Sequence, residues 1–217
     1  AVCQEARRAL DPEAPPAGVL KISAIESAAT GRLPALLSRY HAHYPKVQMQ
    51  FGTDTWSNLV TDVVGHKLDG AIIAVNSDHP DIGKQEIYKE PLVLIASTSL
   101  GEITSPQVLN NLNIFMWPEG CPYRQALENW LKAAKVSTPI TSIASYGTIL
   151  GCVSAGAGVS LVPTGVFEQY QKIGNIKGYT FESLAPIQNY FVWNRNVGFH
   201  RARDAFAELM TDAFRTI

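Results

Sequence analysis

Short apolar runs alternate with helical patterns along the first third of the chain, and this alternation constrains the fold more than any other feature. Leu20–Ile25 alternates apolar and polar residues, as a strand does, and Val47–Phe51 is a second such run. Gly70–Val75 is almost continuously apolar, which is typical of a strand covered on both faces. Helical spacing fills the intervals at Leu33–Tyr44 and Thr55–Val64. This order predicts βαβ units and a parallel sheet.

The remainder of the chain repeats the alternation. Two such halves indicate two α/β lobes rather than one continuous sheet. The expected strands are Leu92–Ser97, Asn113–Trp117, Thr141–Ala144, Gly158–Pro163 and Tyr190–Trp193, and the expected helices are Pro106–Asn111, Pro122–Ala134, Ile149–Ala155 and His200–Phe214.

Composition excludes two classes of protein. With 46% hydrophobic and 17% charged residues, the chain is globular rather than disordered. Its 18 Lys and Arg against 19 Asp and Glu leave a net charge of −1. A domain that binds the phosphate backbone by itself normally carries a clear basic excess. We therefore do not expect this chain alone to hold DNA.

Targeting features and cysteine usage favour a cytoplasmic protein without a membrane partner. The N-terminal residues lack the apolar core of a signal peptide. The longest apolar runs, such as Leu92–Ala96, are far shorter than the roughly 20 residues of a membrane helix. Cys3, Cys121 and Cys152 are widely spaced, so no disulfide framework is implied. Helix-forming residues 2–10 precede a Pro-rich stretch, which suggests a piece of a longer protein.

Signatures of catalysis and metal binding are mostly absent from the sequence. It contains no G-x-S-x-G elbow, no Walker loop and no G-x-G-x-x-G that opens a helix after a strand. His41 and His43 stand two residues apart, so on one helix they point to different faces and cannot share a metal. We therefore predict no catalytic residues, no metal and no cofactor, and we do not expect an enzyme.

Hydroxyl side chains follow several of the predicted strands. In open parallel sheets ligands bind beyond the carboxyl ends of the strands, and the helix N-termini found there favour anions. Ser and Thr are also the preferred helix caps, so capping stays the alternative at any single position. Several such positions converging on one cleft would favour a small polar ligand, with a carboxylate as its candidate charged group. The candidate ligand-binding residues are Ser27, Ala28, Thr53, Thr55, Val75, Ser97, Cys121, Ser145, Tyr146 and Thr148.

Four segments resemble one known family in the same order. The stretch LKISAIESAATGRLPALLSRYHAHYPKVQMQFGT resembles the opening of the effector-binding domain of LysR-type transcriptional regulators. LDGAIIAV resembles the third strand of that domain, and EGCPYRQALENWL is similar to its Gly-Cys-x-Tyr-Arg helix start. SYGTILGCVSAGAGVSLVP resembles the family's helix that ends in a Gly-rich turn. The resemblance covers residues 19–214.

The resemblance implies two Rossmann-like α/β lobes with a crossed hinge, like type 2 periplasmic binding proteins, and a small effector between them. Residues 18–97 and 189–217 would form the first lobe, 98–188 the second, and 1–17 the end of a linker helix and its Pro-rich linker. It also implies a homodimer, a tetramer in the full-length regulator, and DNA binding through an N-terminal helix-turn-helix domain absent from this chain. Leu33–Tyr44, apolar on more than one face, is the expected dimer surface.

Two alternatives to a metabolite-sensing regulator remain open. One is a solute-binding protein of an uptake system, built on the same fold. The other is peroxide sensing, because one branch of the family places a reactive cysteine near the position of Cys121, where Arg124 could lower the thiol pKa. The next cysteine, Cys152, lies in a helix predicted to be buried. We therefore expect no Cys121–Cys152 disulfide switch.

Overall fold

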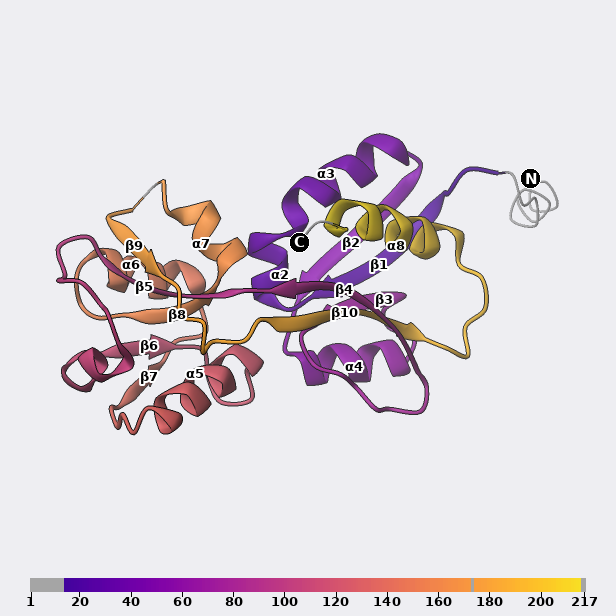
Figure 1. Cartoon of the computed structure of the whole chain (residues 1–217). Helices are drawn as coiled ribbons and strands as arrows, with labels where there is room; N and C mark the ends of the chain where they lie inside the picture. Colours follow the sequence, from indigo (N-terminus) through magenta and orange to yellow (C-terminus); the bar gives the residue numbers. More distant parts are fainter. Residues whose placement is uncertain (1–13, 173, 216–217) are drawn as a thin grey trace.

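Helices cover two separate groups of strands, so the chain forms two lobes (Figure 1). The computed structural model describes residues 14–172 and 174–215. The first lobe contains β1 (Gly18–Ala24), α2 (Glu26–Gly31), α3 (Leu33–His43), β2 (Val47–Thr53), α4 (Trp56–Val64), β3 (Gly70–Ile73), β4 (Ile82–Glu90), β10 (Ile187–Asn194) and α8 (Arg201–Phe214). The second lobe contains β5 (Leu92–Ser97), the 3-10 helix η1 (Pro106–Asn111), β6 (Ile114–Met116), α5 (Pro122–Ala133), β7 (Ile140–Ser142), α6 (Tyr146–Ser154), β8 (Ser160–Pro163), α7 (Thr164–Tyr170) and β9 (Ile176–Tyr179).

The first lobe is built on a five-stranded sheet with the order β2-β1-β3-β10-β4. β1 pairs in parallel with both β2 and β3, which confirms the predicted βαβ units. β3 is buried along its whole length, as its continuous apolar sequence predicts. β10 runs antiparallel to its neighbours β3 and β4, so the sheet is mixed.

Helix α3 packs its apolar side chains into the first lobe. Leu33, Leu36 and Tyr40 are buried, and the Tyr40 hydroxyl donates a hydrogen bond of 2.8 Å to the carbonyl of Ala202 at the start of α8. The exposed positions of the helix are small or polar, such as Ser38. The largest apolar side chains of this helix are thus used in the core, while Leu37 is half-buried, and the dimer surface expected on this helix stays a prediction.

Strand β4 was not predicted from the sequence. It carries charged residues such as Lys84 and Glu86 at its exposed and half-buried positions, and only Ile82, Gly83, Tyr88 and Glu90 are buried. Its pairing with β10 at positions from Ile82 to Glu90 supplies the stability that its own pattern does not reveal. Figure 1 shows β4 and β10 running side by side within the first lobe.

The chain crosses between the lobes at two neighbouring places. It leaves β4 at Glu90, passes Pro91 and enters β5, and it returns from β9 into β10. β5 pairs antiparallel with β8 and β9 in a three-stranded sheet, so Leu92–Ser97 belongs to the second lobe by its hydrogen bonding. The predicted division at residue 97 placed this strand in the first lobe, whereas its hydrogen bonds place it in the second. The division itself stays a prediction.

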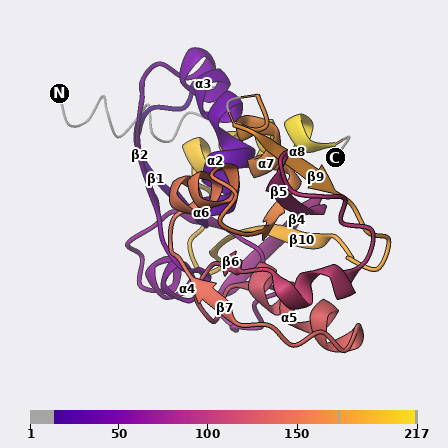
Figure 2. The ribbon, with the colours of Figure 1, turned by 90° about the vertical axis from the view of Figure 1, so that its left-hand side faces the viewer.

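The second lobe combines its three-stranded sheet with a parallel β6-β7 pair. An isolated bridge joins Ile114 of β6 to Val159, next to β8. Helix α7 and strand β9 were not predicted, since both are short and only partly buried. Figure 2 views the molecule with this lobe in front and the first lobe behind it.

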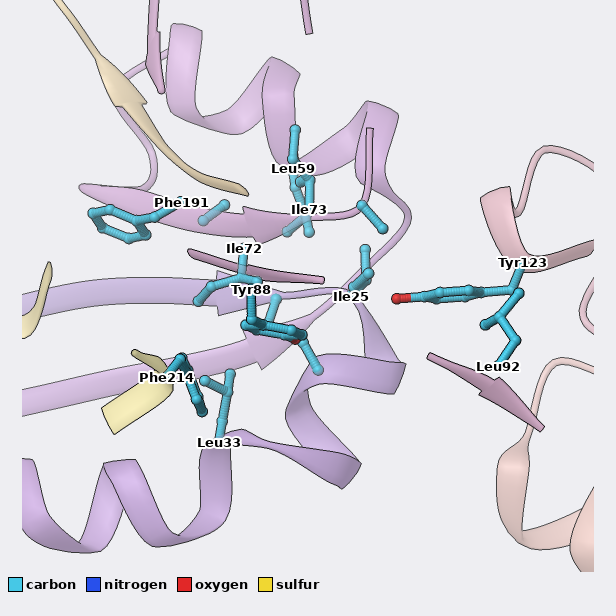
Figure 3. Close-up of a cluster of buried hydrophobic side chains, with 14 of the residues drawn as sticks. Ile25, Leu33, Leu59, Ile72, Ile73, Tyr88, Leu92, Tyr123, Phe191 and Phe214 are labelled. Atoms are coloured by element: carbon cyan, nitrogen blue, oxygen red, sulfur yellow. The ribbon is translucent and has the colours of Figure 1, made fainter. Parts of the chain in front are cut away.

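Part of the hydrophobic core bridges the lobes. Leu33 and Ile25 of the first lobe share one buried cluster with Leu92 and Tyr123 of the second. Figure 3 shows the Tyr123 ring pointing towards Ile25 from the opposite lobe. Among the described helices, none combines the length and the apolar character needed to cross a bilayer.

Candidate functional site

A cavity of about 670 Å³ opens where the lobes meet. The first lobe contributes the turns that follow β1 and β2, and the second contributes the turns that lead into α5 and α6. These turns lie together because the hinge holds the helix-bearing ends of both lobes face to face. The lining comprises residues 25–27, 30, 53–57, 117–123, 144–147 and 170.

Three helices of nine residues or more begin at the cavity. Their N-cap residues are Thr55 for α4, Cys121 for α5 and Ser145 for α6. The Ser145 hydroxyl accepts a hydrogen bond of 3.2 Å from the Thr148 N–H, and Thr55 accepts one of 3.4 Å from the Asn58 N–H. Thr55 and Ser145 are therefore helix caps, in agreement with the preference of these residue types.

Two buried polar groups of lining residues, the Ser27 hydroxyl and the Trp117 indole N–H, have no hydrogen-bond partner among the described residues. Ser27 is 5% exposed. It lies close to the phenols of Tyr123 and Tyr146 without a well-formed bond to either. Burial raises the pKa of both phenols, so both carry their protons at neutral pH. A buried hydroxyl without a partner is unfavourable, and a ligand atom would satisfy it.

Several predicted site residues do line this cavity. They are Ser27, Thr53, Thr55, Cys121, Ser145 and Tyr146, and the role of each in binding stays a prediction.

Ala28, Val75, Ser97 and Thr148 are not among the residues that line the cavity, and their predicted role in binding is untested. Ala28 is packed in the core. The Ser97 hydroxyl bonds to that of Ser99 at 2.8 Å, and Thr148 donates its hydroxyl proton to Ser145. β5 pairs antiparallel with its neighbours, so the rule for the carboxyl ends of parallel strands does not apply to Ser97. Val75 lies beyond β3, which β10 flanks in an antiparallel direction.

Aromatic and acidic residues of the lining were missed from the sequence. Trp56, Trp117 and Tyr170 contribute to the wall, and the Trp117 and Tyr146 rings lie 5.1 Å apart between centroids. The Trp56 indole N–H donates to the Gly120 carbonyl at 3.1 Å, which joins α4 of one lobe to the turn before α5 in the other. The acidic lining residues are Glu26 after β1, Asp54 after β2 and Glu119 before α5.

The surroundings of the Cys121 thiol favour its protonated form. Burial raises its pKa, and this outweighs the lowering by the backbone N–H groups of Arg124 and Tyr123 and by the Arg124 charge. Cys121 and Cys152 are both free thiols, and Cys152 is half-buried on α6 rather than buried. Cys3 lies outside the described residues. No three His, Cys, Asp or Glu side chains in residues 14–172 and 174–215 gather as metal ligands.

The two-lobed architecture with a cavity at the hinge agrees with the sequence of the whole chain. The family model of the LysR substrate binding domain matches residues 13–215. The chain belongs to the LysR family. It is therefore the effector-binding domain of a LysR-type transcriptional regulator, and regulators of this family bind small-molecule effectors and DNA.

Curated LysR relatives are similar over most of this chain. YusT of Bacillus subtilis (strain 168), described as an uncharacterized HTH-type transcriptional regulator, is 32% identical over 95% of this chain and 70% of its own length. The HTH-type transcriptional regulator SoxR of Arthrobacter sp. (strain TE1826) is 31% identical over 93% of this chain and 68% of its own.

Solved structures of LysR-type proteins share the fold. A Corynebacterium glutamicum OxyR C206 mutant superposes with a TM-score of 0.83 at 19% identity, over 99% of this chain and 70% of that one. The Synechocystis PCC6803 CcmR regulatory domain in complex with 2-PG gives 0.82 at 16% identity, over 92% of this chain and 99% of that one. The expected fold, two lobes like those of type 2 periplasmic binding proteins, is confirmed.

Proposed function

We propose that the cavity between the lobes binds a small polar effector and that its occupancy controls DNA binding by the full-length regulator. The observation that carries this proposal is the buried Ser27 hydroxyl, which has no partner and lines a cavity of about 670 Å³. Small-molecule sites are typically clefts of about 300–1,000 Å³ that place a few polar groups in a mostly apolar wall.

Two substitutions test the proposal. A ligand is first found by thermal shift, since one present at about 100 times its Kd stabilises the folded state by roughly 2.7 kcal/mol. Ser27→Ala and Thr53→Val should then weaken its binding by about three- to tenfold each, because each lost hydrogen bond costs about 0.5–1.5 kcal/mol. Calorimetry measures the affinities.

The control for these variants is Thr98→Val, which changes an exposed threonine outside the cavity. It should leave the affinity unchanged. Normal affinity in both Ser27→Ala and Thr53→Val, with normal thermal unfolding, would contradict a ligand-binding role for the two hydroxyls.

The remaining partners follow from the family. We propose that the regulator acts in the cytoplasm as a homodimer, with a tetramer as its larger assembly, and contacts DNA through a helix-turn-helix domain outside residues 1–217. Light scattering on the full-length protein measures this assembly, and a monomer at high micromolar concentration would contradict it. The family match also favours a regulator over an uptake protein, and we infer that the domain has no enzymatic activity.

A further inference from the structure

The charged side chains that line the cavity all have the same sign. Glu26, Asp54 and Glu119 belong to the lining, and no Lys, Arg or His among the described residues does. A carboxylate-bearing effector would therefore approach three negative groups without a cationic side chain to receive it. Such a wall favours a positively charged ligand.

The cationic side chain closest in sequence to the lining residues, Arg124, already has protein partners. Arg124 is 7% exposed, and its Nε donates to Glu128 at 2.7 Å. Its Nη1 bonds to the Trp117 carbonyl and the Ser142 hydroxyl, and its Nη2 lies 3.8 Å from Glu119. The guanidinium is thus held behind the wall of the cavity.

Helix N-termini favour anions because their first N–H groups are free, but some of these N–H groups already donate to protein side chains. The Asn58 N–H of α4 and the Thr148 N–H of α6 donate to their own caps, Thr55 and Ser145. At α5 Pro122 has no N–H to offer, but Cys121 forms no side-chain cap, so two of the three helix ends at the cavity are capped by their own side chains. These contacts reduce what the helix ends can offer an anionic ligand.

Glu26 is the lining carboxylate with the least compensation from the protein. Asp54 accepts hydrogen bonds from the Thr55 N–H at 2.7 Å and the Asn58 side chain at 2.8 Å, so it serves as a second cap of α4. The Glu119 side chain is 88% exposed at the rim. Glu26 is half-buried, and its hydrogen-bond partner among the described residues is the Thr30 hydroxyl at 3.1 Å.

Aromatic rings line the same cavity as this carboxylate. The negative charge of Glu26 acts on the Tyr146 phenol, and Trp117 packs against the Tyr146 ring. Ring faces attract cations, and the attraction is largest for Trp and at desolvated positions. The unpartnered Ser27 hydroxyl, next in sequence to Glu26, is an independent sign that a ligand completes this part of the cavity.

We propose that the effector carries a cationic nitrogen, a primary or quaternary ammonium group, seated between the Glu26 carboxylate and the Trp117–Tyr146 wall. This inference rests on the proposed function, because it names the ligand class of the same cavity. It replaces the carboxylate expected from the sequence as the recognised charge. An ammonium ligand would form a charge-assisted contact with Glu26 and leave its other polar atoms for Ser27.

Matched ligands that differ only in charge test the proposal. Phenethylamine, phenylacetate and phenethyl alcohol form one set, and pentylamine, pentanoate and pentanol form another. Binding is followed by calorimetry and by tryptophan fluorescence, since Trp56 and Trp117 line the cavity. Each amine should bind about tenfold or more tightly than the acid of its set, because the ammonium group gains a charge-assisted contact with Glu26 whereas the carboxylate meets groups of its own sign.

The variant Glu26→Gln removes the charge while keeping the size of the side chain. It should weaken amine binding by about tenfold and leave alcohol binding unchanged. Glu182→Gln is the control, because Glu182 is exposed and outside the lining. Thermal unfolding of both variants verifies that they are folded.

The outcomes separate the two proposals. Acids that bind more tightly than amines, or a Glu26→Gln variant with unchanged amine affinity, would overturn the ammonium inference and leave the effector-binding function standing. A chain that binds none of these compounds and no member of a broad metabolite panel would contradict the proposed function, and the inference with it.

Discussion

The chemistry of Cys121 is decided by its surroundings rather than by its sequence neighbours. Gly-Cys-x-Tyr-Arg places an arginine three residues after the thiol, on the first turn of α5, where it favours the thiolate. Arg124 is instead drawn into contacts with Glu128, Ser142 and the Trp117 carbonyl. Burial of the thiol then dominates and raises its pKa.

Cys121 should therefore react slowly. At pH 7 iodoacetamide should alkylate it severalfold more slowly than it does in the chain unfolded in denaturant, because the thiolate is the reactive form. Peroxide treatment followed by mass spectrometry should find no Cys121–Cys152 bridge. Rapid alkylation in the folded state, or that bridge in good yield, would argue for a redox sensor.

At the scale of elements, α2 and α7 press against each other across the junction of the lobes. A Cβ added at Gly31 would lie 2.7 Å from the backbone carbon of Gly165 and 2.8 Å from the Val166 nitrogen. Arg32, directly after α2, donates two hydrogen bonds of 2.8 Å to Glu90 at the end of β4, and Glu90 also accepts from the Gly165 N–H at 2.9 Å. Close backbone contact and a buried ion pair thus hold the two helices together.

The variant Gly31→Ala should destabilise the fold by about 1–3 kcal/mol, since extra atoms in a tightly packed site force the backbone to shift. Gly151→Ala is the matched control, because Gly151 lies in α6 with nothing within 4 Å of an added Cβ. That change should be neutral or stabilising by up to about 1 kcal/mol, the difference in helix propensity. Urea unfolding measures both, and equal stabilities would contradict a tight α2–α7 contact.

The buried ion pair gives a second prediction at this scale. Glu90→Gln should cost about 3–5 kcal/mol, because it removes the buried one of the two carboxylates that pair with the Arg32 guanidinium. Glu168→Gln is the control: Glu168 also pairs with Arg32, at 3.1 Å, but its side chain is 49% exposed. Exposed pairs contribute about 0–1 kcal/mol, so the control should change stability little. Similar losses of stability in both variants would contradict the larger contribution assigned to the Arg32–Glu90 pair.

For the whole molecule, buried tyrosines link stability to alkaline pH. Burial raises the pKa of Tyr40, Tyr88, Tyr123 and Tyr146 above the ordinary value of 10. Above this pH the unfolded chain releases phenol protons that the folded chain retains, so the folded state binds more protons and the free energy of unfolding falls. The stabilisation is fully present below pH 10 and is lost as the pH rises further.

The melting temperature should accordingly fall steeply from pH 10 upward, and phenolate absorbance should appear together with unfolding. Each retained proton contributes about 1.4 kcal/mol per pH unit. Tyr88→Phe removes one of these protons, so the free energy of unfolding should fall less steeply with pH in this variant. Tyr44→Phe, at a half-buried position, is the control. Phenolate absorbance that appears well before unfolding would contradict the buried, protonated state.

Much of the architecture could be predicted from the chain alone. Hydrophobic periodicity is a local property, so it identified β1, β2, β3 and the helices α3, α4 and α5 close to their observed bounds. Ser27 after β1, Thr53 at the end of β2 and Ser145 after β7 were also predicted from the sequence, and they do line the cavity. β4 was not predicted because its sequence is rich in charged residues. This segment forms a strand only through pairing with β10, almost 100 residues later in the chain.

The character of the site was decided by tertiary structure. Whether a hydroxyl caps a helix, as Ser145 does, or lacks a partner, as Ser27 does, depends on which groups the fold brings within hydrogen-bond distance. The net charge of the chain did not predict the charge of the site either. The composition is balanced, yet the cavity wall has three carboxylates and no lining cation among the described residues. Local sequence determined the elements because helix and strand periodicity need only neighbouring residues, while ligand chemistry depends on side chains from two lobes that only folding brings together.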